Sequence, residues 1–76
     1  MNTLNDLRQA GQRGRILDVT GDDAVAVRLM EMGLTDGAEI ELIGFAPLGD
    51  PVEFLIRGYR LSLRKAEASR VTLELL

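Results

Sequence analysis

The sequence contains no cysteine and no histidine, and these two absences exclude much of the usual chemistry of protein sites. Without cysteine there is neither a disulfide framework nor a thiolate metal site. Without histidine the chain lacks the commonest metal ligand and the commonest general base. The sequence therefore predicts no bound cofactor, no metal centre and no enzymatic activity.

Basic clusters and long apolar runs are also missing. The formal net charge is −3, whereas nucleic-acid-binding proteins normally present a basic face to the phosphates. No run approaches the roughly 20 apolar residues of a membrane helix, and the N-terminal MNTLNDLRQAG is too polar for a signal peptide. We therefore expect no nucleic-acid partner, no direct membrane insertion and a cytoplasmic location.

Alternation of apolar and polar residues indicates strands along most of the chain. At 76 residues the chain has room for one core, so we expect a single domain over residues 1–76. Leu17 and Val19 in the first strand, and Leu75 in the last, are expected to face inward. A polar turn is expected at 65–69. The expected strands cover 14–20, 38–45, 52–57, 59–64 and 71–75.

One principal helix is predicted over roughly 22–33. Asp22 or Asp23 would cap its start. Val25, Leu29 and Met32 share one face, which Ala26 and Met30 widen. A shorter helical turn is expected near the N-terminus, with Thr3 as its N-cap and Asp6 three positions on. Five glycines are expected to shape the turns: Gly33, Gly37, Gly44, Gly49 and Gly58.

These elements predict a mainly β fold. Short antiparallel strands with tight turns, a glycine kink at Gly44 and a glycine bulge at the Gly58 hairpin suit a small SH3-like, partly open barrel of about five strands with one inserted helix. A split α+β sheet with the helix across one face is the alternative.

Apolar residues gather in the stretch FAPLGDP, residues 45–51, which must connect two strands. Phe45, Pro47 and Leu48 lie in a segment where contact with solvent is hard to avoid. Leu55 faces outward by parity. We expect these side chains either to fold under and plug one end of the barrel or to form a contact surface for a partner.

Three longer stretches of the sequence are RLMEMGLTDGAEIEL, APLGDPVEF and RGYRLSLRKAEASRV. In this order and at this spacing they resemble the FeoA family, the small cytoplasmic accessory proteins of bacterial ferrous iron uptake. The resemblance extends from Leu4 to about Val71. The front of the helix, AVAVRLM, is less basic than in many relatives, and RQAGQ replaces the usual short turn KPGQ.

The resemblance implies an SH3-like barrel without catalysis. It implies a role supporting the ferrous iron permease, a membrane protein with a cytoplasmic GTP-binding domain, through protein–protein contact with its cytoplasmic part. The residues expected to make this contact are those of the helix and of the exposed apolar positions, namely Arg28, Phe45, Pro47, Leu48 and Leu55.

Other interpretations stay open at this point. The chain could be a regulatory domain related to the SH3-like C-terminal domain of iron-dependent transcriptional repressors. Direct carriage of Fe²⁺ would have to depend on carboxylates alone. A weak homo-oligomer is also compatible with the sequence.

Overall fold

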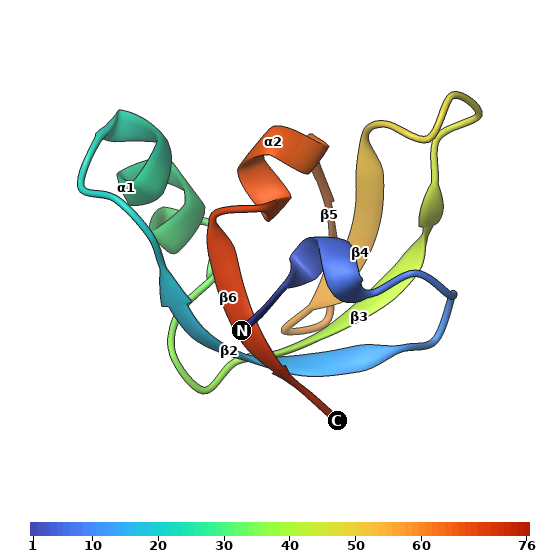
Figure 1. The fold of residues 1–76 in the computed structure, drawn as a ribbon, viewed down its shortest axis with the longest axis horizontal. Coiled ribbons are helices and arrows are strands. Elements are labelled where there is room, and N and C mark those ends of the chain that lie inside the picture. Colours follow the sequence, from blue (N-terminus) through green and yellow to red (C-terminus); the bar gives the residue numbers. More distant parts are fainter.

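A strongly bent antiparallel sheet of six strands forms most of the molecule (Figure 1). The computed structural model describes residues 1–76, and the strand order across the sheet is β1-β6-β2-β3-β4-β5. The strands are β1 (Asn2–Thr3), β2 (Arg13–Val19), β3 (Glu39–Phe45), β4 (Val52–Ile56), β5 (Tyr59–Leu63) and β6 (Val71–Leu75). The helical segments are the 3-10 turn η1 (Leu4–Asp6), α1 (Ala24–Glu31) and α2 (Lys65–Ala68).

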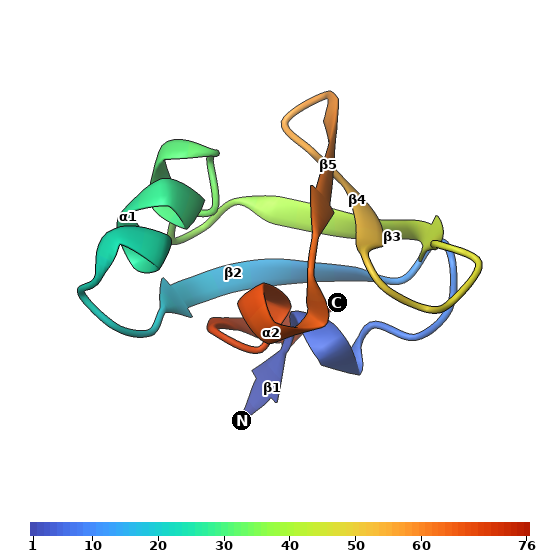
Figure 2. The same cartoon turned by 90° about the horizontal axis from the view of Figure 1, so that it is seen from above.

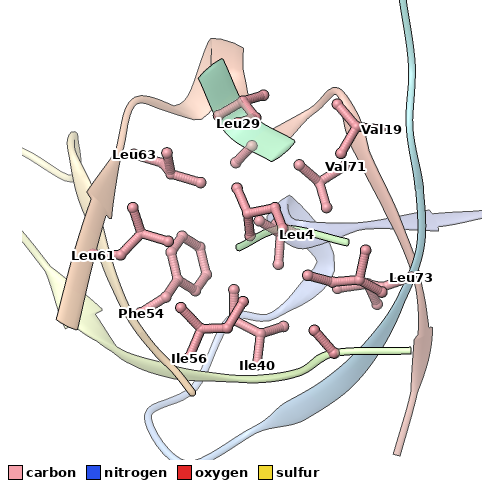
Figure 3. Packing of buried hydrophobic residues seen from close by; sticks show 14 of the residues in the cluster. Leu4, Val19, Leu29, Ile40, Phe54, Ile56, Leu61, Leu63, Val71 and Leu73 are labelled. Carbon is pink, nitrogen blue, oxygen red and sulfur yellow. The ribbon is translucent and has the colours of Figure 1, made fainter. Parts of the chain in front are cut away.

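The sheet curls around a core of 18 buried apolar residues. Figure 3 shows Phe54 of β4 facing this interior together with Leu61 of β5 and Leu73 of β6, so strands that are far apart in the sheet order contribute to one core. Leu4 of η1 and Leu29 of α1 fill the same interior. The mainly β, partly open barrel is therefore confirmed, with a short β1 added to the five expected strands.

Two bulges bend the sheet. In β3 the pairing with β4 shifts between Leu42 and Gly44, which is the kink expected at this glycine. In β2 the pairing with β6 shifts between Ile16 and Asp18, and Leu17 is the extra residue. The bulge reverses the expected parity, so Ile16 is buried and Leu17 is 45% exposed. The inward assignment of Leu17 was therefore wrong.

Leu75 was also wrongly assigned to the core. Its side chain is 44% exposed, although Val71 and Leu73 of the same strand are buried. The neighbouring strand β1 pairs with β6 only as far as Leu73, which lies opposite Asn2. Leu75 therefore extends past β1 and is not covered from that side.

Helix α1 has well-defined ends and is shorter than the predicted 22–33. Asp23 is the N-cap, and its Oδ1 accepts a hydrogen bond from the Ala26 N–H at 3.1 Å. At the C-terminus the Gly33 N–H donates to the Met30 carbonyl and the Leu34 N–H to the Leu29 carbonyl, as in a Schellman motif. Gly33 has φ +99°, which an L side chain rarely adopts. This geometry ends the helix.

The exposed side of α1 includes Met30, which is 41% exposed. Ala26 and Leu29 are fully buried, and Val25 and Met32 pack against the core from its edge. The buried stripe is thus narrower than the sequence pattern indicated. Only a narrow stripe of α1 contacts the core, because the helix covers one end of the barrel. Met30 lies outside this stripe and is partly exposed.

The connections next to β5 differ from the prediction in two ways. Residues 65–69, expected to be a polar turn, contain the whole of the short helix α2. Glu67 Oε1 accepts from the Arg64 N–H at 3.0 Å, and Ala68 is buried. The hairpin has no bulge, because Ile56 pairs directly with Tyr59. Its two turn residues, Arg57 and Gly58, both have positive φ, which is the geometry of a type I′ turn.

Candidate partner-binding surface

The segment 46–51 between β3 and β4 is a closed loop that carries an exposed leucine. The Ala46 N–H donates to the Pro51 carbonyl at 3.0 Å, and the Gly49 N–H donates to the Ala46 carbonyl at 2.7 Å. The Asp50 carboxylate accepts from the Lys65 N–H at 2.9 Å and so ties the loop to α2. Leu48 is 97% exposed. Its side chain does not plug the barrel.

Phe45 lies at the base of this loop, between two cavities. A cavity of about 400 Å³ on one side is floored by Leu4, Leu7 and Val52, all of which are buried. A second cavity of about 250 Å³ lies beside Glu53 and the loop. Phe45 itself is 46% exposed. Its ring therefore forms a wall of both cavities instead of part of the core.

The rim of the larger cavity is basic. Arg8, Lys65 and Asn5 complete its lining, and no carboxylate contributes to it. The Lys65 ammonium lies 5.9 Å from the centroid of the Phe45 ring, within the range of a cation–π contact. Neither Arg8 nor Lys65 belongs to any of the ion pairs in the molecule. Two positive charges thus flank an apolar floor in a chain whose net charge is −3.

Ion pairs instead occupy the outer face of the sheet. Arg15 bridges Glu74 at 3.1 Å and Glu39 at 3.9 Å, and Arg60 lies 3.7 Å from Glu53. Such exposed pairs contribute about 0 to 1 kcal/mol each. This face is polar and internally paired, in contrast to the rim of the larger cavity, where Arg8 and Lys65 have no carboxylate partner.

The surroundings of α1 are also occupied by internal contacts. Arg28 pairs with Glu67 of α2, and the Tyr59 hydroxyl donates to the Met32 carbonyl. At the other end of the helix Arg70 holds Asp23 with hydrogen bonds of 2.6 and 3.1 Å. These bonds, followed by the bond from the Ala26 N–H, lower the pKa of Asp23 below its ordinary value.

The five predicted contact residues do not form one surface. Phe45 is the last residue of β3, and Pro47 and Leu48 follow it in the loop to β4. Arg28 lies on α1, at the opposite end of the molecule from the 46–51 loop in both views (Figures 1 and 2). Leu55 is half-buried on the outer face, opposite Glu41 and Arg60 in the neighbouring strands.

Sequence reasoning did not identify the cavity floor and rim. Leu4 and Leu7 come from the N-terminal turn, and Lys65 from the start of α2, far apart along the chain. The capping box of Thr3 and Asp6 was visible in the sequence and fixes this turn. Its docking beside α2, through the hydrogen bond from the Asn5 side chain to the Lys65 carbonyl, depends on tertiary contacts, for which no short motif exists.

Metal-ligating side chains are not gathered at any point of the fold, since no three Asp or Glu residues cluster. Neither helix is long and apolar enough to span a membrane.

Comparison with known proteins identifies the family. The FeoA domain model matches residues 2–75. The chain belongs to the FeoA domain family. A curated relative, the Fe(2+) transport protein A/Fe(2+) transporter FeoB fusion protein of Porphyromonas gingivalis, is 36% identical over 66 residues. This match covers 87% of the chain but only 8% of that much longer relative.

Solved FeoA structures share the fold of this FeoA domain. The FeoA protein of Chlorobium tepidum is 39% identical with a TM-score of 0.87, over 99% of this chain and 70% of that one. The FeoA of Stenotrophomonas maltophilia, complexed with zinc and described as a procaryotic SH3 domain protein, is 29% identical with a TM-score of 0.84, over 97% and 91% of the two chains. The SH3-like fold is thus confirmed.

A more distant likeness concerns the fold alone. The manganese-activated repressor ScaR has a TM-score of 0.80 with 19% identity, and the match covers 97% of this chain and 35% of the repressor. At this identity the shared barrel says nothing of a shared activity.

Proposed function

We propose that this FeoA domain is a cytoplasmic accessory protein of ferrous iron uptake that acts without catalysis, by docking on the cytoplasmic part of the GTP-binding ferrous iron permease. The fusion of a related domain to FeoB in one polypeptide supports this partner, because fused domains work at high effective concentration. We place the docking surface at the loop of Leu48 because this side chain is almost completely exposed.

The Phe45–Leu48 segment suits docking on physical grounds. Exposed apolar side chains are removed from water on binding, and each buried one stabilises the complex by up to about 2 kcal/mol. The loop is closed by its own hydrogen bonds and anchored to α2, so little conformational entropy is lost when it binds. Arg28 and Leu55 are less suited, since Arg28 is paired with Glu67 and Leu55 is half-buried.

A test compares two exposed apolar residues at opposite ends of the molecule. Leu48→Glu should abolish capture of the permease's cytoplasmic domain and lower ferrous iron uptake in cells that lack the native protein. Val27→Glu, on the exposed side of α1, is the matched control and should leave both unchanged. Equal capture by Leu48→Glu and the native chain would remove this loop as the docking site, and loss in Val27→Glu alone would move the site to α1.

The repressor interpretation has weaker support. It depends on the likeness to ScaR, which concerns only the barrel. A gel shift with operator DNA and the purified chain should show no retardation.

A further inference from the structure

The cavity beside Phe45 combines an apolar floor with an unpaired basic rim, and this combination selects a type of ligand. We propose that it binds an extended acidic segment of a partner protein, in which one apolar side chain enters the cavity between flanking carboxylates. That the partner is the permease rests on the proposed function, whereas the chemistry of the segment follows from the cavity.

The apolar floor of the cavity determines which side chain of the partner segment would enter it. Leu4, Leu7 and Val52 are buried beneath the cavity, and the Phe45 ring stands at its side. A volume of about 400 Å³ lies in the range of sites that hold a small ligand. A single leucine-sized anchor would bury its apolar surface there, as anchors do at the centres of interfaces.

The basic rim of the cavity determines the charge of the partner residues on either side of this anchor. Arg8 and Lys65 have no carboxylate partner, and Asp50, the acidic residue bound to α2 at this point, accepts the Lys65 backbone N–H and does not line the cavity. An acidic segment would satisfy both cations, whereas a basic segment would place like charges together. This preference for an acidic segment comes from the two cations of the cavity rim and not from the overall charge of the chain, which is −3.

The walls of the cavity are already held in place. The Asn5 side-chain amide donates to the Lys65 carbonyl at 3.0 Å and joins η1 to α2. Asp50 joins the β3–β4 loop to the same residue. The two sides of the cavity are therefore cross-linked through Lys65 before any ligand arrives, which limits the entropy lost on binding.

Short peptides test the chemistry directly. Amide NMR spectra of the full chain would be recorded during titration with acetyl-Asp-Leu-Asp-amide. Saturable shifts are expected at residues 4–8, Phe45, Val52 and Lys65. The neutral acetyl-Asn-Leu-Asn-amide and the truncated acetyl-Asp-Ala-Asp-amide should each bind several-fold more weakly. Equal responses to all three peptides, or saturable shifts elsewhere in the molecule, would overturn the proposal.

Variants of the rim add a second readout. Arg8→Gln and Lys65→Gln should each weaken binding of acetyl-Asp-Leu-Asp-amide by about threefold to tenfold, and added salt should weaken the native complex in the same way. Arg60→Gln on the outer face is the charge-matched control and should bind like the native chain. Unchanged affinity in both rim variants would contradict the role of the cations.

A capture experiment separates this inference from the proposed function. If the immobilised permease domain retains the native chain but not the double variant Arg8→Gln/Lys65→Gln, both are supported. If it retains both equally, the cavity is not the docking site although the permease is the partner. If it does not retain the native chain, the proposed function fails, and the peptide titration still decides the ligand of the cavity.

Discussion

The two phenylalanines of the chain occupy opposite environments. Phe54 is fully buried at the centre of the barrel, and Phe45 is 46% exposed between two cavities. The two residues lie on neighbouring strands of the same sheet, where Phe54 pairs with Leu42 and Phe45 pairs with Val52. The bulge between Leu42 and Gly44 separates these two pairs. The comparison indicates that one phenylalanine maintains the fold and that the other is available for contact with another molecule.

Removal of the buried ring should have the largest effect. Phe54→Ala is expected to lower the free energy of unfolding by about 3 to 5 kcal/mol, because it loses buried apolar area and leaves a cavity. A domain of this size has a margin of about the same amount, so the variant should be largely unfolded. Circular dichroism during urea titration measures this. A cooperative transition close to that of the native chain would contradict the central role of Phe54.

Glycines at the two ends of the barrel extend the comparison. Gly33 and Gly49 both have φ near +90°, so alanine at either should cost about 1 to 2 kcal/mol in backbone strain. A Cβ at Gly33 would also meet the Tyr59 hydroxyl at 2.8 Å, whereas at Gly49 its nearest neighbour is the flexible Lys65 ammonium at 3.7 Å. Thermal unfolding should therefore show Gly33→Ala as the less stable variant. The reverse order would mean that the end near Tyr59 is the more adaptable one.

Removal of the exposed ring should have a much smaller effect on stability. Phe45→Ala is expected to lower the free energy of unfolding by about 1 kcal/mol, because about half of the side chain is already in water. Differential scanning calorimetry of this variant beside Phe54→Ala gives the contrast directly. Similar losses in the two variants would show that Phe45 belongs to the core after all.

The ion pair of Asp23 gives the α1 end a pH dependence. The folded-state pKa of Asp23 lies below its ordinary value of 3.8, so the pair stabilises the native state above that pH. The contribution is lost as the pH falls below 3.8 and Asp23 becomes protonated. Asp23→Asn keeps an N-cap side chain but loses the charge. Its thermal midpoint should be slightly lower than the native one at neutral pH and should converge with it in acid; a constant difference would exclude the pair as the cause.

The sequence predicted the architecture better than the surface. Alternation placed Val52, Phe54 and Ile56 inside correctly, because a strand without bulges keeps its parity. Parity failed at Leu17, where a bulge has no glycine to mark it in the sequence. The bulge in β3 was predictable because Gly44 marks it.

The candidate site was only partly predictable. Phe45, Pro47 and Leu48 are close enough in the sequence to be recognised as an apolar segment. Arg8 and Lys65 line the same cavity only because η1 docks beside α2, and no local pattern encodes that docking. Arg28 was expected to contact a partner, but in this fold it pairs with Glu67, a residue 39 positions away in the chain.

The central claim is that the Phe45–Leu48 surface serves binding and contributes little to folding. Isothermal titration calorimetry of the purified chain against the cytoplasmic domain of the permease tests it most directly, with Leu48→Glu compared at an unchanged thermal midpoint. The account predicts that the substitution weakens binding by about tenfold or more. Equal affinity of the native chain and Leu48→Glu would contradict it.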